Sequence, residues 1–368
     1  MSSSEKSIKQ QPIKRMGEFD VWKLVFAVVI VVHHTYLLPT DIPEIPLFQG
    51  GSIGVEFFFL VSGFLLARSA SKTDLDPNLG HQTACFIVKK IKSFFPYMVF
   101  AFAVTFVFKA LSLDWGGVAT GKNLFNSIVE LSFARMSGMG DAFFNVPTWY
   151  LSTMVLSMMV LYPLILKYRG AMTKVVFPVV AICILGYLFQ KYGQLRTPDA
   201  WDGLLYKGTL RGFAEIMLGA FAFELCEWFK KYKFTFASRL LLTAFEYGVL
   251  LFIIVYSNEA SCWDLDCPSI LLMVLCVVIM GANASVFASV LGRSKFVSLC
   301  GKFSLMLYLN HLYWIYIFDV MGLHMGYYEM TALLVVASIA SSIVCWLVTD
   351  AVVKFLKLDA VKALFVSK

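Results

Sequence analysis

The chain has 368 residues, of which 59% are hydrophobic and 15% are charged, and its mean hydropathy is +0.74. Soluble domains have about 45–50% apolar and about 25% charged residues, so this composition excludes an ordinary soluble protein. The net charge is +7, but no basic stretch is interleaved with solvent-exposed aromatic residues, so no nucleic-acid partner is expected.

Apolar runs long enough to cross a bilayer recur along the whole chain. Each is close to the ~20 residues that a transmembrane helix needs. Ten spans are predicted, at residues 21–38, 47–67, 93–112, 146–166, 173–190, 208–229, 240–257, 268–290, 301–320 and 330–353. Because lipid leaves no water to bond exposed backbone groups, the predicted fold is an all-α integral membrane protein, a polytopic bundle of about ten transmembrane helices.

The basic residues predict the orientation of this bundle. With the N-terminus inside, seven of the 31 lysines and arginines fall in outer segments: Lys109, Lys122, Arg135, Lys191, Arg196, Lys207 and Arg211. This bias follows the positive-inside rule and predicts that both termini are cytoplasmic. The predicted domains are a disordered cytoplasmic tail (1–20), a transmembrane domain (21–357) and a short cytoplasmic tail (358–368). Within the outer connection 113–145, NLFNSIVELSFARM is expected to form a helix on the outer surface.

Two adjacent histidines, His33 and His34, lie in the first span. At 100° per residue, Lys23 and His34 point within roughly 20° of each other and lie about 16 Å apart along the helix axis. His33 points roughly 80° away from Lys23, whereas Asp20 falls near the Lys23–His34 stripe. His34 is therefore the candidate for chemistry, and His33 is expected to pack against or bond a neighbouring helix.

Ionisable residues within membrane spans are costly and suggest function by default. Besides the two histidines, they are Glu56, Glu215, Glu246 and His311. A structural hydrogen bond between helices is a rival explanation for each, and it is favoured for Glu246. Glu215 follows Arg211 by one helical turn, so a local ion pair can explain both residues.

Two of the eight cysteines, Cys262 and Cys267, share a short outer loop. They can close a small disulfide if that side of the membrane is oxidising. Two free thiols are about as good an interpretation, because spacing alone does not fix geometry. No His/Cys cluster has metal-ligand spacing, so no metal is expected.

Five blocks of the sequence stand out when they are taken together. The first, FDVWKLVFAVVIVVHH (19–34), places a basic residue, ten residues and then a histidine, at Lys23 and His34. The others are GSIGVEFFFLVSGFLLARS (51–69), FIVKKIKSFFPYMVF (86–100), VPTWYLSTMVLSMMVLYPL (146–164) and GKFSLMLYLNHLYWIY (301–316). In this order, the blocks resemble the acyltransferase-3 family of bacterial membrane proteins over nearly the whole chain.

One departure from the family pattern limits what the resemblance implies. Many relatives carry a glutamate a few residues after the Trp-x-Leu of the fourth block. Here Trp149-Tyr150-Leu151 is followed by Ser152, Thr153 and Met154. No role of that carboxylate is therefore carried over.

The resemblance implies O-acylation, most often acetylation, of a carbohydrate at the bacterial inner membrane, with acetyl-CoA as the cytoplasmic donor and no metal. The acceptor is a polysaccharide or a lipid-linked glycan. A sugar hydroxyl is a poor nucleophile, and a neutral histidine can take its proton, so His34 is the expected general base. Glu56 is a candidate to fix the imidazole tautomer, and Lys23 to steer the donor toward His34.

Further residues are assigned to binding. Lys89, Lys90 and Lys92 cluster on the predicted cytoplasmic side, where they can pair with the phosphates of acetyl-CoA. Positive-inside topology alone explains the same three lysines equally well. Trp149, Arg211 and His311 are the residues predicted to bind the acceptor.

A second function remains open from the sequence. A transporter or flippase of a lipid-linked sugar can use His34 and Glu56 as a proton relay. Transporters often show internal repeats or paired Gly/Pro-broken helices. Neither is clear in this sequence, which favours the acyltransferase.

Overall fold

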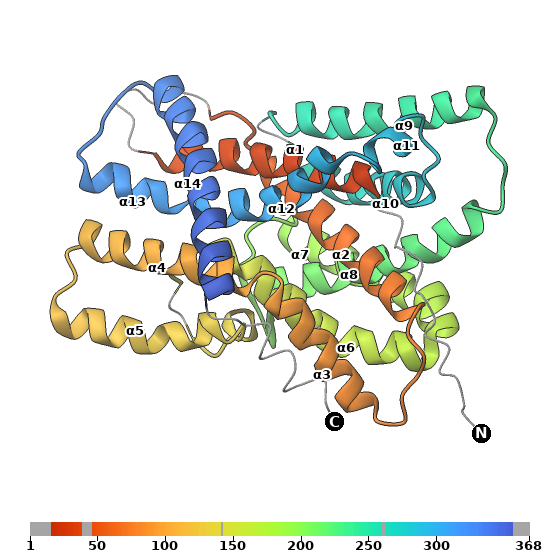
Figure 1. Ribbon diagram of the computed structural model, residues 1–368, viewed down its shortest axis with the longest axis horizontal. Coiled ribbons are helices and arrows are strands. Elements are labelled where there is room, and N and C mark those ends of the chain that lie inside the picture. Colours follow the sequence, from red (N-terminus) through yellow and green to blue (C-terminus); the bar gives the residue numbers. More distant parts are fainter. Residues whose placement is uncertain (1–15, 39–45, 141–142, 260–261, 356–368) are drawn as a thin grey trace.

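The computed structural model describes residues 16–38, 46–140, 143–259 and 262–355. Almost all secondary structure in these residues is helical (Figure 1). The α-helices are α1 Gly17–His33, α2 Gly54–Ala70, α3 Leu79–Lys92, α4 Phe95–Ser112, α5 Gly117–Leu131, α6 Thr148–Ala171, α7 Phe177–Tyr192, α8 Lys207–Phe229, α9 Phe236–Tyr256, α10 Asp266–Ala282, α11 Ala288–Leu291, α12 Lys295–Asn310, α13 Tyr313–Val320 and α14 Tyr327–Phe355. The shorter helical turns are η1 His34–Leu37, η2 Gly51–Ile53, η3 Arg135–Ser137, the π-helical η4 Met172–Val176 and η5 Cys262–Leu265.

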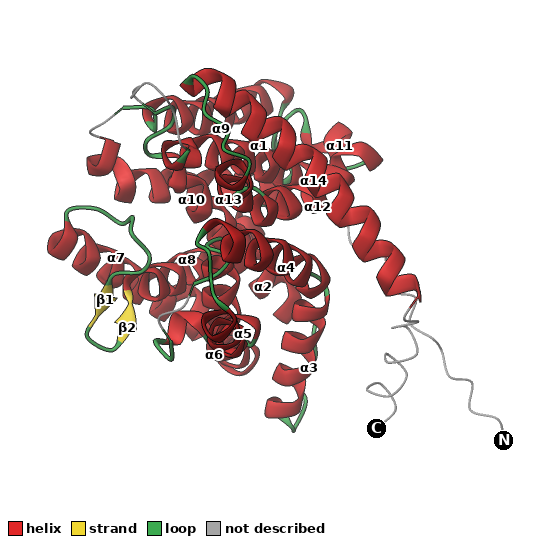
Figure 2. Ribbon diagram, turned by 90° about the vertical axis from the view of Figure 1, so that its left-hand side faces the viewer, coloured by secondary structure: helices red, strands yellow, loops and turns green. Residues whose placement is uncertain are grey.

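Two short strands complete the described structure. Strand β1 (Trp201–Asp202) pairs antiparallel with β2 (Leu205–Tyr206), and Gly203 has a φ of +68° in the turn between them. The hairpin lies at the edge of the bundle next to α7 and leads into α8 (Figure 2).

Six stretches of the described residues are long and apolar enough to cross a membrane: Gly17–Leu37, Gly51–Ala70, Phe95–Ser112, Thr148–Tyr192, Phe236–Tyr256 and Tyr327–Phe355. The protein is therefore an all-α, multi-pass membrane protein. All ten predicted spans fall on helices, but the count of ten stays a prediction. Four features explain why fewer than ten stretches qualify. Helix α8 carries charged residues, and α10 is short. The ninth expected span is broken between α12 and α13, and the fourth and fifth expected spans form one continuous helical stretch.

The centre of the bundle is the packing of α2 against α8 (Figure 1). Most residues of both helices are buried. A Cβ atom added at Gly63 would clash with the carbonyl of Ile216, and one at Gly219 would clash with the carbonyl of Leu60. Small residues of this kind let helix backbones approach closely in membranes, where packing rather than water exclusion holds helices together.

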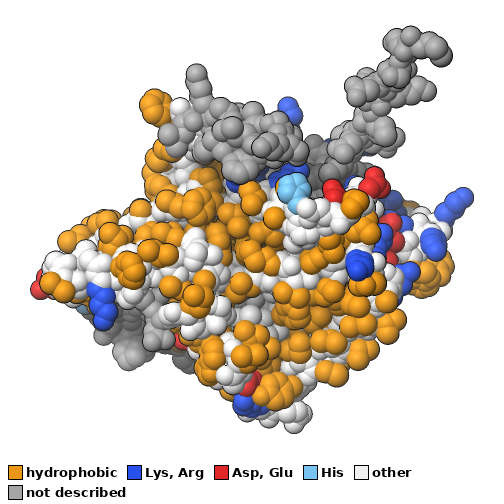
Figure 3. Space-filling view, turned by 90° about the horizontal axis from the view of Figure 1, so that it is seen from below, with side chains coloured by type: hydrophobic (Ala, Val, Ile, Leu, Met, Phe, Trp, Pro, Cys, Tyr) orange, Lys and Arg blue, Asp and Glu red, His pale blue; other side chains and the backbone are white. Residues whose placement is uncertain are grey.

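The surface fits a lipid environment. In the view of Figure 3, hydrophobic side chains cover most of the exposed face, and charged side chains gather near its edges. Helix α14 alone exposes Val336, Ile343, Val344, Leu347 and Val348. In water such an apolar surface would be unfavourable, whereas lipid solvates it.

Some predicted boundaries differ in the structure. Helix α1 begins at Gly17, so residues 17–20 of the predicted tail are helical and buried. Glu18 and Asp20 in the first turn favour this start because acidic groups stabilise a helix N-terminus. The expected outer-loop helix is confirmed as α5, which exposes Leu124, Phe125 and Ile128. The remainder of the first tail, residues 1–15, and the tail 358–368 lie outside the described residues.

Candidate active site

The site forms where two helices break. Helix α1 ends at His33, with His34 starting η1, and α12 ends one residue before His311. His311 is fully buried, and irregular backbone at membrane depth is tolerated where protein surrounds it. The two breaks bring the imidazoles together, so that Nε2 of His311 lies 3.2 Å from Nδ1 of His34.

The hydrogen bonds assign the protons on both rings. Nδ1 of His311 lies 2.7 Å from the carbonyl of Tyr308, which can only accept, so this nitrogen carries a proton and Nε2 is an acceptor. Nδ1 of His34 then faces two acceptors, His311 and the carbonyl of Ile30 at 2.8 Å. It must donate, which leaves the lone pair of neutral His34 on Nε2. This is the tautomer that a general base needs.

His33 is held differently. Its Nδ1 lies 2.8 Å from the carbonyl of Phe48, in the turn before α2. The expected bond therefore goes to a loop rather than to a neighbouring helix. Both histidines line the same cavity, so the helical phase that distinguishes them does not remove His33 from the site.

The cavity around His34, here called the outer cavity, has a volume of about 560 Å³. Its walls come from the end of α1, the loops before α2, α6 and α8, and the helices α8 and α12. Both aromatic and polar side chains line it. The aromatic ones include Tyr36, Phe143, Trp149 and Tyr308, and the polar ones include Gln49, Arg135, Arg196, Asp199 and Arg211. A cavity of this size and composition suits a polar organic ligand.

Arg211 is embedded in a buried ion-pair cluster at the wall of this cavity. Its Nη1 lies 3.4 Å from Oε1 of Glu56 and its Nε lies 3.6 Å from Oε1 of Glu215. Its guanidinium also lies 5.1 Å from the ring of Trp149. The expected Arg211–Glu215 pair is confirmed. The structure places Glu56 against Arg211, whereas the partners of Nδ1 of His34 are Ile30 and His311.

Arg135 is a cavity residue that the sequence placed only in an outer loop. Its Nη1 donates to the carbonyls of Asn145 and Val146, both at 2.8 Å, and to Oγ1 of Thr148 at 2.9 Å. Glu130 accepts from the same segment, including Oγ1 of Thr148 at 2.8 Å. These bonds fix the loop that leads into α6 and Trp149.

A second, inner cavity of about 140 Å³ begins on the other side of Tyr308. Lys23 and Lys90 both line it, and Tyr308 lines both the inner and the outer cavity. The face of α1 that carries Lys23 and His34 therefore borders both cavities, and Tyr308 is part of the wall of each. Lys23 lines a different cavity from His34.

The three lysines of α3 do not all line the same cavity. Lys89 and Lys90 line a third cavity of about 590 Å³, the entrance cavity, together with His81 and Ser93. Lys90 and Ser93 line the inner cavity as well, whereas Lys92 is exposed and lines neither. Burial, followed by the nearby charge of Lys23, lowers the pKa of Lys90 to about 8.

The structure also bears on the sequence interpretations of Glu246, of the two outer-loop cysteines and of metal binding. Glu246 of α9 is fully buried and interacts with the side chain of Trp22 in α1, so a structural bond between helices stays the interpretation of this residue. Cys267 has a free thiol, while the Cys262 side chain lies outside the described residues. The described residues contain no group of three or more potential metal ligands.

The contact between His311 and His34 was missed from the sequence, as was Tyr308. One signal was available, because Tyr308 and His311 are three residues apart and belong to the last of the five blocks. The break after α12 was not visible, because the apolar run continues through it.

The comparisons with known proteins identify the family of the chain. The sequence model of the acyltransferase-3 family, described as "Acyltransferase domain", matches residues 16–350. The chain therefore belongs to this family, and membership supports a membrane acyltransferase. No curated protein and no solved structure matches the chain significantly.

Proposed function

We propose that the protein is a membrane-bound O-acyltransferase that moves an acetyl group from acetyl-CoA to a hydroxyl of a surface polysaccharide or lipid-linked glycan. One observation carries the proposal. His34 lines the outer cavity, and it is hydrogen-bonded to His311, which is in turn bonded to the carbonyl of Tyr308. These bonds leave Nε2 of His34 free to accept a proton.

In the proposed reaction, the acceptor hydroxyl attacks the carbonyl carbon of the thioester while Nε2 of His34 takes the hydroxyl proton. The carbon–sulfur bond then breaks, and the departing CoA thiolate takes that proton from His34. The products are the O-acetyl ester and CoA. The transient imidazolium is supported at Nδ1 by Ile30 and His311, the place that an acidic residue occupies in catalytic triads.

The lining of the outer cavity supports a carbohydrate acceptor. Aromatic rings such as Trp149 offer flat apolar faces, and Gln49, Arg196 and Asp199 offer hydrogen-bonding groups. A sugar has both apolar C–H faces and hydroxyls, and binding sites combine apolar walls with a few polar groups in the same way. Because Arg211 already pairs with two carboxylates, we assign it to holding Trp149 rather than to direct acceptor binding.

The inner and entrance cavities support a donor that carries phosphates and arrives from the side of α3. Lys89 and Lys90 line the entrance, and Lys23 lies further inside. Ammonium groups bind phosphate as point charges. We assign this side to the cytoplasm, where acetyl-CoA is available. The transporter alternative used Glu56 as the relay partner of His34, whereas the structure pairs Glu56 with Arg211.

The test is acetyl transfer by the purified protein in lipid nanodiscs. Labelled acetyl-CoA is supplied together with membranes of the source cells as the acceptor. The proposal expects release of CoA and a base-labile label on glycan. Movement of glycan across vesicle membranes without consumption of acetyl-CoA would support a transporter and contradict the proposal.

A further inference from the structure

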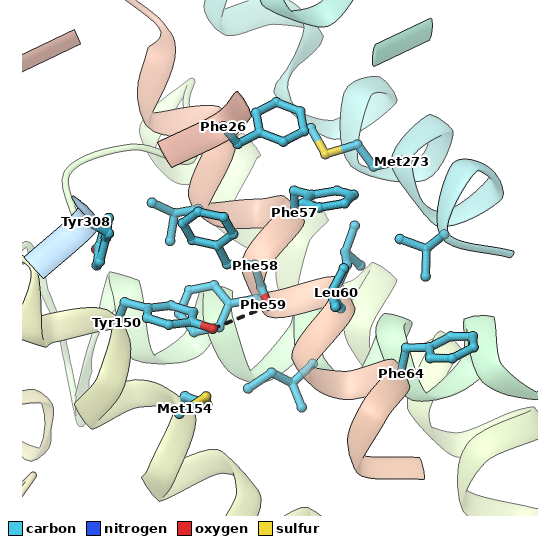
Figure 4. Packing of buried hydrophobic residues seen from close by; sticks show 14 of the residues in the cluster. Phe26, Phe57, Phe58, Phe59, Leu60, Phe64, Tyr150, Met154, Met273 and Tyr308 are labelled. Atoms are coloured by element: carbon cyan, nitrogen blue, oxygen red, sulfur yellow. Dashed lines mark hydrogen bonds between the residues drawn. The ribbon is translucent and has the colours of Figure 1, made fainter. Parts of the chain in front are cut away.

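Three aromatic rings pack together on the wall of the inner cavity. They belong to Phe58 of α2, Tyr150 of α6 and Tyr308 of α12 (Figure 4). The ring centroids of Phe58 and Tyr150 are 5.9 Å apart, those of Phe58 and Tyr308 5.8 Å, and those of Tyr150 and Tyr308 5.9 Å. All three pairs meet edge to face, the arrangement that aromatic pairs prefer. The rings therefore form a closed triangle contributed by three different helices.

One member of the triangle also reaches the outer cavity. All three residues line the inner cavity, and Tyr308 alone of the three also lines the outer one. On the opposite side, Lys90 and Ser93 line both the inner cavity and the entrance cavity. The shared lining residues thus place the three cavities in the order entrance, inner, outer, and Tyr308 of the triangle is the lining residue that the last two have in common.

Resting on the proposed acetyl-CoA-dependent function, we propose that the inner cavity binds the pantetheine arm of the donor and that Phe58, Tyr150 and Tyr308 form a gate. The thioester reaches His34 by parting these rings. The gate keeps the two sides of the membrane separate when no donor is bound.

The lining of the inner cavity fits this arm, which is a thin chain with two amides. Leu65, Phe94 and Met154 supply apolar walls. Ser93 and Ser304 donate to the carbonyls of Lys90 and Gly301, at 2.6 and 3.1 Å. Each hydroxyl oxygen keeps lone pairs that can accept from an amide N–H of the arm.

The spacing of the charged and catalytic groups agrees with the length of the arm. Lys23 and His34 are separated by eleven residues of α1 and η1, which corresponds to about 16 Å along a helix. An extended pantetheine arm spans a similar distance between its phosphate and its sulfur. A donor with its phosphates near Lys23 and Lys90 therefore brings its thioester to the level of His34.

The gate can open without breaking the hydrogen bond that sets the tautomer of the base. The hydroxyl of Tyr150 lies 2.9 Å from the hydroxyl of Ser62, which holds that ring. The backbone carbonyl of Tyr308 accepts from Nδ1 of His311, and the two rings also pack side by side, with their centroids 6.0 Å apart. A rotation of the Tyr308 side chain leaves that carbonyl, and hence the tautomers of His311 and His34, unchanged.

The experiment measures thiol accessibility from each side of the membrane. A variant without the eight native cysteines receives one reporter, Ser304→Cys in the inner cavity or Gln49→Cys in the outer cavity. Vesicles of both orientations are treated with a membrane-impermeant charged methanethiosulfonate, with and without desulfo-CoA; this analogue, called CoA in the rest of this test, lacks the thiol that would consume the reagent. The Ser304→Cys reporter should react only from the side of α3, and CoA on that side should slow its reaction. Gln49→Cys should react only from the other side and should not respond to CoA.

Opening the gate is the second arm of the experiment. Tyr308→Ala removes two of the three ring contacts, so labelling of Ser304→Cys from the outer side should rise roughly 5- to 150-fold. Tyr308→Phe keeps the ring and should not change it. Tyr313→Ala is the matched control, because Tyr313 is as buried as Tyr308, at 2%, and lines none of the three cavities. Phe58→Ala is the alternative opening variant if Tyr308→Ala does not insert.

Each outcome decides the proposal. Labelling of Ser304→Cys from the outer side with the rings intact would show that the triangle is no barrier and would overturn the gate. Unchanged labelling in the presence of CoA, from a protein that still consumes labelled acetyl-CoA, would overturn the arm site and leave the proposed function standing. If CoA does not protect Ser304→Cys and the protein does not consume acetyl-CoA either, both the arm site and the proposed function would be contradicted.

Discussion

The outer cavity and the entrance cavity hold their polar groups in different ways. Around the outer cavity, His34, His311 and Arg211 are each fixed by partners at defined distances. Around the entrance, the lysines sit on α3, whose only buried residue is Ile87. The difference matches two tasks. A general base works only in a fixed geometry, whereas a phosphate is attracted by a point charge that tolerates a flexible side chain.

Removal of Arg211 should have the largest effect on stability and would sharpen the contrast with the lysines. Arg211→Met leaves Glu56 and Glu215 buried without their cation, and breaking a buried pair in this way costs about 3–5 kcal/mol. The measurement is the free energy of unfolding in mixed micelles. Adding Glu56→Gln and Glu215→Gln to Arg211→Met should restore most of the loss. A stable Arg211→Met variant that is specifically defective in acceptor binding would instead return Arg211 to the acceptor site.

His311 tests whether the base depends on its neighbour. His311→Ala removes one of the two acceptors at Nδ1 of His34, while Ile30 remains. The loss of one buried hydrogen bond costs about 1–3 kcal/mol, so kcat should fall roughly 5- to 150-fold. KM for acetyl-CoA should stay unchanged, because His311 lines neither the inner nor the entrance cavity. A raised KM for the acceptor with kcat unchanged would favour the substrate-binding role that the sequence suggested.

The α3 lysines give a matched pair for the donor side. Lys90 lines two cavities, whereas Lys92 is exposed and lines neither. Lys90→Gln should raise KM for acetyl-CoA by up to about tenfold, the effect of one charge-assisted contact. Lys92→Gln should change it little, and added salt should weaken donor binding more in the wild type than in Lys90→Gln. Equal effects of the two substitutions would mean that the cluster acts only through topology.

The smallest expected effect is a pH dependence of donor binding. Desolvation of the half-buried Lys90, followed by the charge of Lys23, lowers its pKa to about 8, so its ammonium is charged below that pH and neutral above it. KM for acetyl-CoA should therefore rise as pH increases through about 8. Lys90→Arg should remove this step because arginine stays charged. The titratable and charged groups around Lys90 are Lys23, Asp76, His81, Cys85, Lys89, Tyr150, Tyr162 and Tyr308. A step that persists in Lys90→Arg would belong to one of those groups.

The sequence predicted the helical membrane fold, the placement of a helix in every expected span and the candidate base. These depend on local properties, namely apolar run length and the phase of residues along α1. Contacts between distant segments did not follow from it. The bond between His34 and His311 joins residues 277 positions apart, and it requires breaks in α1 and α12 that apolar composition does not mark. The partner of Glu56 was likewise set by the close packing of α2 against α8.

The most direct test of the central claim compares His34→Ala with His33→Ala. Both proteins are purified in nanodiscs, checked for correct insertion and assayed for transfer of labelled acetyl groups. The histidines are adjacent and line the same cavity, so they share every general effect of the site. The account predicts that His34→Ala lowers transfer by about 10²–10⁴-fold, as loss of a general base does, while His33→Ala keeps much of the activity. Equal loss in the two variants, or activity retained in His34→Ala, would contradict it.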